Sequence, residues 1–242
     1  MRDLSHGLTE MGWKVTVLTA TAANNLDNGD TSCRVVRLGS ENSNADTHKT
    51  VSGKALAGLS FFLACIAWSR RNSREIDLIL IASNPPFIGL IGPILSISKK
   101  LPYVFLFQDL FPDSAVLSGV LKPEGLVTKF WGIVMQWVCR KSAATVVLNQ
   151  AMAKQLQRAS SRQLPLTVIH NWAIEQGSAV PRSTNPFAVE YGFAGRFTIQ
   201  YSGNFGRLHD IKTLLTTAAQ LQDTPTIQFL FIGGGAKQQE IQ

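Results

Sequence analysis

The chain has 242 residues, of which 45% are hydrophobic and 16% are charged. This composition excludes a disordered tail and requires a folded core, and the length suits one large domain or one and a half. The formal net charge is +7: residues 1–170 hold 18 Lys and Arg against 11 Asp and Glu, whereas residues 171–242 hold five of each. All of the net positive charge therefore lies in the first part of the chain.

A basic surface can meet nucleic acid, an anionic membrane or a phosphorylated substrate. Nucleic acid is disfavoured, because the sequence has no zinc-finger spacing, no aromatic RNA-binding signature and no Lys/Arg run longer than two. Basic pairs close three apolar stretches instead, which favours a membrane-facing surface. These pairs are Arg70-Arg71, Lys99-Lys100 and Arg140-Lys141.

The cysteines and the apolar stretches limit the compartment and the membrane topology. Cys33, Cys65 and Cys139 show no CxxC spacing, so neither a disulfide framework nor a zinc site is predicted, and a reducing cytoplasm is the default. No continuous apolar region marks a signal peptide at the start. The apolar stretches at 55–68 and 126–139 are shorter than the roughly 18 residues of a membrane span and are predicted to be core or interfacial helices.

The first part of the chain opens on a predicted helix. Its apolar stripe runs from Leu4 to Met11 and stops at Gly12, and a β-rich run over 13–19 follows. An α/β unit normally has a strand before such a helix, so the first strand of the fold is expected to be missing. The next elements are a polar loop at 22–32, a strand at 33–38, a second loop at 42–48 and a helix at 55–68.

Residues 77–82 form an apolar run without polar alternation, which predicts a strand covered on both faces, as in a parallel sheet. Strands and helices then alternate as far as Ile169, a pattern typical of a doubly wound parallel sheet. The predicted elements are helices at 88–97, 124–141 and 150–159, strands at 103–107, 144–148 and 166–169, and a loop from Gln108.

A second α/β unit is predicted after a linker. Residues 173–195 contain Pro181 and Pro186 and no sustained period, which indicates an interdomain connection. A strand at 198–202, a helix at 211–221 and a strand at 227–232 follow. We therefore predict two Rossmann-like domains, residues 1–172 and 196–242, the second incomplete, and expect the chain to be a fragment that is inactive alone.

An acidic loop follows a buried strand at a place where ligands of open α/β sheets bind. Asp109 lies directly after the strand at 103–107, and Asp113 lies four residues later. A carboxylate there can orient or deprotonate a hydroxyl nucleophile. The alternative is that Asp109 or Asp113 only caps the following turn, and position alone does not separate the two interpretations.

Two other strand ends carry polar groups. Ser83 and Asn84 precede two prolines and would line the same crevice as Asp109, although a strand-ending turn needs no function to explain it. His170 stands just before the predicted linker, where a lone histidine is more often structural than catalytic.

Two glycine-rich segments follow strands in the second unit. In the first, Gly203 and Gly206 would let the backbone approach a ligand, and the next helix N-terminus offers unpaired N–H groups and a partial positive charge to a phosphate. Arg207 or His209 would add a side-chain contact. Gly233, Gly234 and Gly235 form a second segment of this kind, and two on one face favour phosphate binding.

Seven segments in a fixed order carry a family resemblance: HGLTEMGWKVTVLTA, DLILIASNPP, DLFPDSAVLSGVL, VVLNQAMAKQL, VIHNWA, YSGNFGRLHDIKTLL and FLFIGGGAKQQEI. Together they resemble glycosyltransferase family 4, retaining enzymes of the GT-B fold with two facing Rossmann-like domains. The DLFPDS and GNFG versions are most similar to the colanic-acid-type branch, which builds bacterial surface polysaccharides on a lipid diphosphate carrier. Against this family the chain is expected to be truncated at both ends, without the first strand and the later glutamate pair.

The resemblance implies transfer of a hexose from a nucleoside diphosphate sugar to a lipid-linked saccharide, with retained anomeric configuration and no metal or other cofactor. It gives Asp109 the catalytic role and places Ser83, Asn84 and Asp113 at the acceptor. The implied donor-binding residues are Gly203, Asn204, Gly206, Arg207, His209, Gly233, Gly234 and Gly235.

One departure from the family affects the donor phosphate. Many members have an Arg directly after the glycine of the donor loop and a Lys five residues on, whereas this chain has Asn204 and His209 there. Asn carries no charge, so the phosphate contact is expected from Arg207, from backbone N–H groups or partly from His209.

Basic residues lie within or beside the apolar helix at 126–139 and after the apolar helix at 55–68, which predicts a peripheral protein on the inner face of the plasma membrane. They are Lys122, Lys129, Arg140 and Lys141 for the first helix and Arg70, Arg71 and Arg74 for the second. Burial of the helix at 126–139 in the core is the alternative. For function, the alternative is a non-catalytic nucleotide- or sugar-phosphate-binding module; the glycine segments suit both functions, whereas the acidic loop favours a transferase. An epimerase is disfavoured, because its strand-end loops should carry more acids and histidines.

Overall fold

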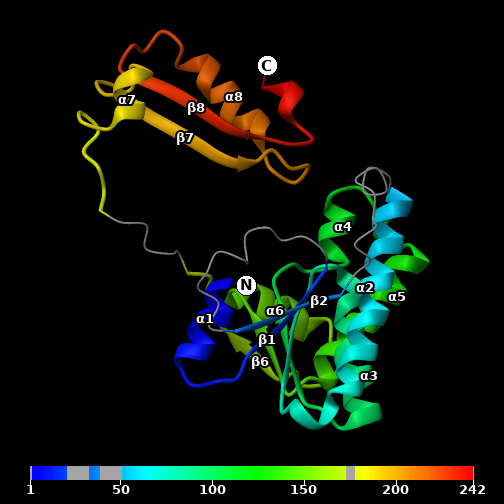
Figure 1. Cartoon of the computed structure of the whole chain (residues 1–242). Coiled ribbons are helices and arrows are strands. Elements are labelled where there is room, and N and C mark those ends of the chain that lie inside the picture. The colour runs from blue at the N-terminus through cyan, green and yellow to red at the C-terminus, as the bar shows by residue number, and fades with distance from the viewer. Residues whose placement is uncertain (1, 21–32, 39–50, 173–177, 242) are drawn as a thin grey trace. The chain divides into compact units, whose positions relative to one another are not determined.

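The computed structural model describes residues 2–20, 33–38, 51–172 and 178–241. The chain divides into two compact units: the first comprises residues 1–113 and 124–171, and the second residues 114–123 and 172–242. The loops expected at 22–32 and 42–48 lie outside the described residues. Each unit is an α/β assembly of parallel strands and helices (Figure 1).

Unit 1 contains two parallel sheets. β1 (Thr16–Thr19) pairs with β2 (Arg34–Arg37), and a four-stranded sheet has the order β3-β4-β5-β6. Because neighbouring strands of this sheet follow one another in the chain and run parallel, their carboxyl ends meet at one edge. Its strands are β3 (Ile79–Ala82), β4 (Tyr103–Phe107), β5 (Ala144–Val147) and β6 (Leu166–Val168).

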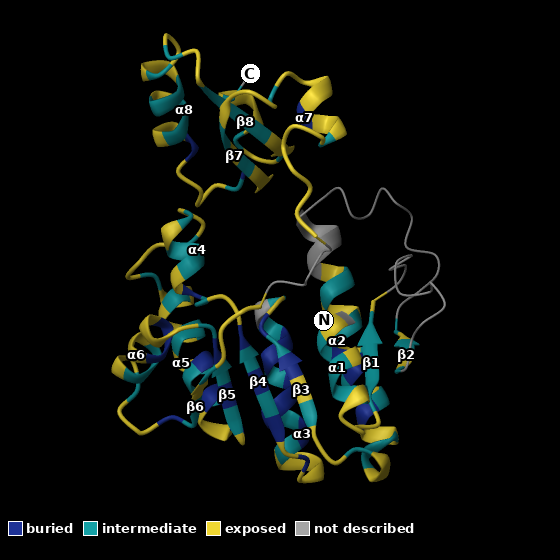
Figure 2. Ribbon diagram, turned by 90° about the vertical axis from the view of Figure 1, so that its left-hand side faces the viewer, coloured by how far each residue is buried: buried dark blue, intermediate teal, exposed yellow. Residues whose placement is uncertain are grey.

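The core of unit 1 lies between this sheet and its helices. β4 is the best-buried strand, with Tyr103, Phe105 and Phe107 fully enclosed, and buried residues concentrate on β4 and α3 in Figure 2. α2 and α5 both pack on α3. The helices are α1 (Arg2–Glu10), α2 (Val51–Arg71), η2 (Ser73–Glu75), η3 (Pro86–Leu90), α3 (Ile91–Lys99), α5 (Leu126–Lys141) and α6 (Gln150–Arg158).

A glycine lets α3 approach β4 closely. A Cβ atom on Gly92 would lie 2.5 Å from ring atoms of Tyr103, far inside van der Waals contact. The Tyr103 hydroxyl, buried beneath α3, donates a 2.6 Å hydrogen bond to the carbonyl of Val138 on α5, and burial raises the pKa of Tyr103 above its ordinary value. Gly92 and Tyr103 thus fix α3 and α5 against the central strand.

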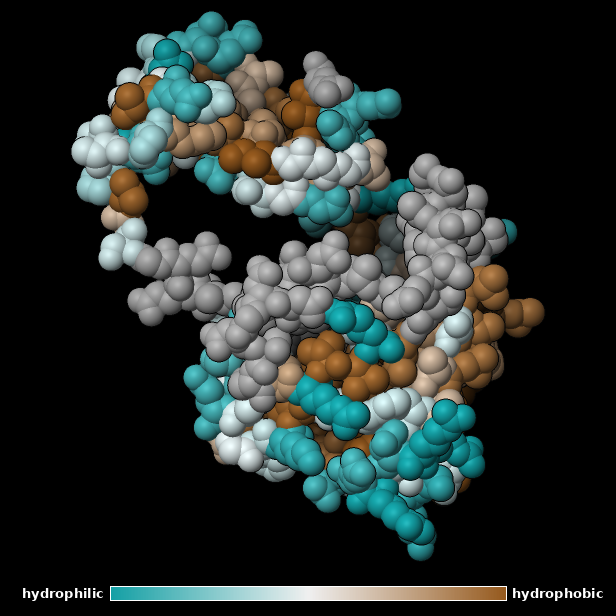
Figure 3. Space-filling view, in the orientation of Figure 1, coloured by the Kyte–Doolittle hydropathy of each residue, from teal (hydrophilic) through white to brown (hydrophobic). Residues whose placement is uncertain are grey.

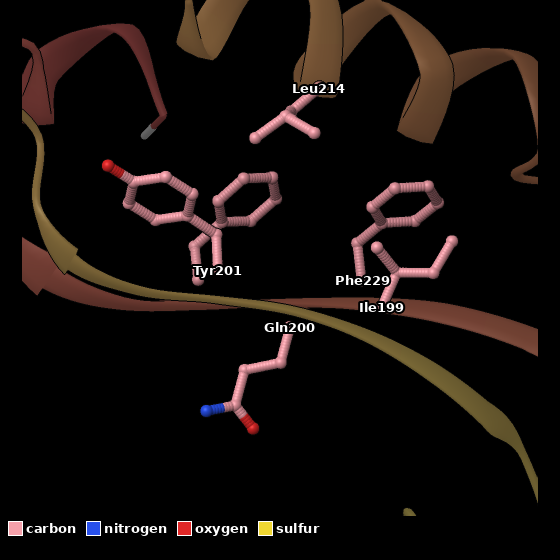
Figure 4. Close-up of a pocket in the computed structure, with 6 residues that line it drawn as sticks. Ile199, Gln200, Tyr201, Leu214 and Phe229 are labelled. Atoms are coloured by element: carbon pink, nitrogen blue, oxygen red, sulfur yellow. The ribbon is translucent and has the colours of Figure 1, made fainter. Parts of the chain in front are cut away.

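Unit 2 is built on two long parallel strands, β7 (Phe197–Asn204) and β8 (Ile227–Gly234), with helices α7 (Pro186–Glu190) and α8 (Ile211–Gln220) and the short η4 (Gln238–Glu240). An apolar cavity of about 90 Å³ lies between the strands and α8. Figure 4 shows Tyr201, Leu214 and Phe229 on the α8 side of the strands and Gln200 on the opposite side. This cavity is the incompletely filled core of the unit.

Three sequence expectations need correction. Residues from Gln108 to the next helix are not all loop, because α4 (Asp113–Leu117) forms there. The expected linker contains α7, which Asn185 caps by accepting hydrogen bonds from two backbone amides. Both strands of unit 2 continue into their glycine segments, since Gly203 pairs with Gly233 and Asn204 with Gly234; ladder pairing extends them beyond the last apolar residue.

Candidate functional site

The carboxyl ends of β3 and β4 bring two predicted acceptor segments together. Ala82 pairs with Leu106, and the next amide, that of Ser83, donates to the Leu106 carbonyl at 3.0 Å. The buried Ser83 Oγ accepts hydrogen bonds from the amides of Gln108, at 3.1 Å, and Asp109, at 3.4 Å. Ser83 therefore anchors the backbone of the acidic loop. This structural role accounts for the Ser83 hydroxyl without any contact to a substrate.

The Asp109 side chain is exposed at this edge. Within the described ranges its carboxylate has no hydrogen-bond or ion-pair partner, and only its backbone carbonyl is engaged, by the Phe111 amide at 2.8 Å. The next helix, α4, begins four residues later, at Asp113. Asp109 thus caps no described helix, and its carboxylate is available to a ligand.

The other acceptor candidates differ from Asp109. The carboxylate of Asp113 accepts a hydrogen bond from the Gln155 side chain of α6, so one of its oxygens is already engaged. Asn84 is exposed beside Ser83, and His170 is exposed after β6. The sequence analysis missed Gln155, because a contact between residues 42 positions apart leaves no local signal.

The glycine segments of unit 2 lie against each other. Gly203, Gly233 and Gly235 have φ values of 149°, 143° and 146°, a region open to glycine and strained for other residues. A Cβ on Gly233 would lie 1.9 Å from the Gly203 carbonyl oxygen, and one on Gly235 would lie 2.4 Å from Asn204 Oδ1. Close approach of the two strand ends therefore requires glycine at both positions, with or without a ligand.

His209 turns back onto β7. Its Nδ1 shares a hydrogen bond with the Tyr201 hydroxyl, which also donates to the Asn204 carbonyl at 3.0 Å. Gly206 lies beside both Asn204 and His209. A Cβ atom added to Gly206 would lie 3.4 Å from the Asn204 side chain and 3.8 Å from the His209 ring. The structure thus gathers Asn204, Gly206 and His209 into one turn.

The N-terminus of α8 offers fewer unpaired N–H groups than expected. Asp210 caps it, accepting from the Thr213 amide at 3.1 Å and the Thr213 hydroxyl at 2.6 Å, and the Ile211 amide donates to the His209 carbonyl at 3.0 Å. The hydrogen bonds from Thr213, and secondarily the charges of Lys237 and Lys212, hold the pKa of Asp210 below its ordinary value. A side chain of the protein therefore already occupies much of the anion position at this helix start.

Two basic residues flank this turn. Arg207 is exposed and has no hydrogen-bond or ion-pair partner among the described residues. Lys237, which the sequence analysis did not select, donates from Nζ to the His209 carbonyl at 2.7 Å. Its position directly after the Gly-Gly-Gly-Ala segment was the only sequence signal that could have found it.

Comparison with known proteins identifies the family. Residues 1–172 match the model of the glycosyl transferase 4-like domain. The chain belongs to this glycosyltransferase family. The probable glycosyltransferase WbjE of Pseudomonas aeruginosa is 30% identical over 165 residues, which make up 68% of this chain and 41% of that protein.

A solved structure supports the fold. Sucrose-phosphate synthase from Thermosynechococcus elongatus superposes with a TM-score of 0.68 over 99% of this chain and 59% of its own, at 20% identity. This likeness shows the predicted GT-B fold of a glycosyltransferase. The chain spans less than two thirds of the length of either protein.

Two features relevant to metals and membranes are absent from the part of the chain that the structure describes. No cluster of three or more His, Cys, Asp or Glu side chains there is arranged to hold a metal ion. In the same ranges, no helix has both the length and the hydropathy needed to cross a bilayer.

Proposed function

We propose that this glycosyltransferase moves a hexose from a nucleoside diphosphate sugar to a hydroxyl of a lipid-linked saccharide, with retained anomeric configuration, in the synthesis of a cell-surface polysaccharide. The observation that carries the proposal is the unengaged Asp109 carboxylate at the carboxyl edge of β4, on a loop that the buried Ser83 hydroxyl anchors. A carboxylate at this edge can orient and deprotonate an acceptor hydroxyl, and a simple binding module has no need of such a group.

Asp109 acts on the acceptor. Its carboxylate orients the attacking hydroxyl and accepts its proton as the new bond forms between the acceptor oxygen and the anomeric carbon of the sugar. The bond from that carbon to the diphosphate breaks, and the nucleoside diphosphate leaves as the anion. Retained configuration in this single step requires the hydroxyl to attack the face of the sugar from which the diphosphate departs. Ser83 holds the loop in position, and Asn84 and Asp113 supply further hydrogen-bonding groups along the same edge.

The test is the substitution Asp109→Asn in a longer protein that carries this chain, with transfer measured from radiolabelled nucleoside diphosphate sugars to a lipid extract containing polyprenyl diphosphate saccharides. Losing the base should reduce turnover by roughly 10²- to 10⁴-fold, with unfolding little changed. Asp77→Asn is the matched control, because Asp77 is equally exposed but precedes β3, at the opposite end of the strands. Equal turnover in the wild type and Asp109→Asn would remove Asp109 from the reaction.

The proposed acceptor is embedded in a membrane, and two helices of unit 1 carry apolar stripes suited to such a surface. On α5, Leu126, Phe130 and Ile133 are 87%, 60% and 66% exposed. Their spacing of four and three residues places them on one helix face. Buried Met135, Val138 and Cys139 mark the opposite, core-facing side, so the expectation that this helix is core holds only for part of it.

α2 repeats the arrangement. Leu56, Leu59 and Leu63 are 67%, 49% and 56% exposed and follow the same helical spacing. Nearer the C-terminus of each helix, the face that carries the apolar stripe also carries an exposed arginine, Arg70 on α2 and Arg140 on α5. Hydrophobic residues gather over α2 and α5 in Figure 3.

An apolar stripe that ends in arginine fits an anionic bilayer, because the stripe can enter the acyl boundary while the guanidinium reaches a lipid phosphate. We infer that α2 and α5 lie on the inner leaflet of the plasma membrane and keep the enzyme peripheral. Each arginine near an anionic surface contributes about 1 kcal/mol.

Liposome flotation tests this attachment. The chain should float with phosphatidylcholine vesicles that contain phosphatidylglycerol, and raised salt should weaken its binding. Replacing Phe130 and Ile133 together by Ser should abolish flotation, whereas Met11→Ser, which changes a 77% exposed residue just after α1, should not. Flotation of the double variant at the wild-type level would contradict the role of α5.

A further inference from the structure

The backbone of Lys237 is fixed next to the carboxyl ends of β7 and β8, although Lys237 lies outside both runs of glycines. The Phe205 amide donates to the Gly234 carbonyl at 2.8 Å, and the Lys237 amide donates to the Phe205 carbonyl at 3.0 Å. The missing Cβ of Gly235 gives Asn204 the space to pack against this turn. These contacts hold the backbone of Lys237 against the turn at residues 203–209, although Lys237 and His209 lie 28 positions apart in sequence.

The side chain of Lys237 is held as well. Its Nζ donates to the His209 carbonyl at 2.7 Å, and the residue is only partly exposed. An ammonium group has three N–H donors, and the described residues engage one of them. Two charged donors thus remain for a ligand at the turn that carries Asn204 and Gly206.

Neither His209 nor Arg207 offers an equivalent group. His209 Nδ1 is already engaged with the Tyr201 hydroxyl, so this side chain has only Nε2 left for a ligand. Arg207 is charged but exposed and unanchored among the described residues.

A donor whose leaving group is a diphosphate needs positive charge where negative charge grows, and a cation held in advance is more effective than one that must be ordered. We propose that Lys237 binds the diphosphate of the nucleotide sugar and stabilises it as it leaves, in the position where Asn204 and His209 supply no fixed charge. This assignment rests on the proposed function.

The experiment is made in a longer protein that carries this chain, and it compares Lys237→Gln with Lys212→Gln, which removes an exposed lysine from the first turn of α8. Calorimetry measures binding of UDP, GDP, ADP and dTDP and of the corresponding nucleosides. For whichever diphosphate binds, Lys237→Gln should weaken binding by about 10- to 100-fold, the value of a charged hydrogen bond. Nucleoside affinity should stay unchanged, Lys237→Arg should restore most of the loss, and Lys212→Gln should change affinity by less than about threefold.

The outcomes separate this inference from the proposed function. If a diphosphate binds the wild type and Lys237→Gln equally, or if the variant loses nucleoside and diphosphate affinity alike, Lys237 is not the diphosphate ligand and the transferase proposal stands. If no nucleoside diphosphate binds the wild type at millimolar concentration, the proposed donor site is wrong and the role of Lys237 falls with it.

Discussion

The two units of this protein stabilise their candidate sites in different ways. In unit 1, β4 lies in a closed core with Tyr103, Phe105 and Phe107 at 0% exposure, and Asp109 follows from this rigid strand. In unit 2, every residue of β7 and β8 is at least partly exposed, and the fully buried Ile211 lies at the start of α8. Side-chain packing supports the loop that carries Asp109, whereas backbone contacts between glycines support the turn at residues 203–209.

This difference predicts how each unit tolerates an added methyl group. In unit 1, Gly92 faces the ring of Tyr103, a side chain that can shift. In unit 2, Gly233 faces the main-chain carbonyl oxygen of Gly203, which cannot shift without breaking strand pairing. The consequences can be measured unit by unit through hydrogen exchange.

The largest effect is expected for Gly233→Ala. The new Cβ would lie 1.9 Å from the Gly203 oxygen at a φ of 143°, so clash and backbone strain together should cost about 3 kcal/mol or more. Hydrogen exchange followed by mass spectrometry should show lost protection in β7 and β8 with unit 1 unchanged. Gly195→Ala is the control, because its Cβ meets nothing within 4 Å; equal protection in both variants would contradict a backbone-supported donor turn.

A smaller loss is expected for Gly92→Ala. Its Cβ would meet the Tyr103 ring at 2.5 Å, and overpacking a core typically costs about 1 to 3 kcal/mol. Urea unfolding followed by tryptophan fluorescence should shift to lower urea. Gly132→Ala on α5, with nothing within 4 Å of its Cβ, should instead gain up to about 1 kcal/mol from helix propensity. A Gly92→Ala midpoint at or above that of the wild type would show that α3 does not pack tightly on β4.

The smallest effect concerns pH and unit 2. The pKa of Asp210 is lower in the folded state than its ordinary value of 3.8, mainly through the hydrogen bonds from Thr213. Its stabilisation of α8 is therefore present above that value and is lost as the pH falls through the folded pKa. An NMR titration of the Thr213 amide should have its midpoint below 3.8, and Asp210→Asn, which keeps a capping oxygen, should abolish this titration. A midpoint above 3.8 would contradict the cap, and Asp223→Asn serves as the charge-matched control.

The central sheet was the most predictable part of the fold. The expected strand at 103–107 is identical to β4, because a wholly apolar run between polar loops has few alternatives to a buried strand. α4 and α7 were missed, since each has only five residues and no apolar period. The ends of β7 and β8 were missed because glycine carries no strand signal, and ladder pairing alone extends them.

For the candidate site, sequence reasoning could select residue types at strand ends but not their partners. Position alone did not separate a catalytic role from a capping role for Asp109 or Asp113. In the structure, α4 begins at Asp113 and the Gln155 side chain of α6 donates to its carboxylate. Likewise, the sequence left the phosphate contact open between Arg207, backbone N–H groups and His209, all in or beside the first glycine segment. Lys237 stands outside that segment and comes to the turn through the pairing of β7 with β8.

The sequence by itself determined the α/β alternation, the family and the chemistry that each strand end can offer, because these depend on local residue types and their order. Tertiary structure decided which of those groups are engaged and which remain available. Ser83 reaches the Asp109 amide and Lys237 reaches the His209 carbonyl across 26 and 28 positions of sequence. Strand register sets such distances, and register depends on the packing of a whole layer rather than on any local segment.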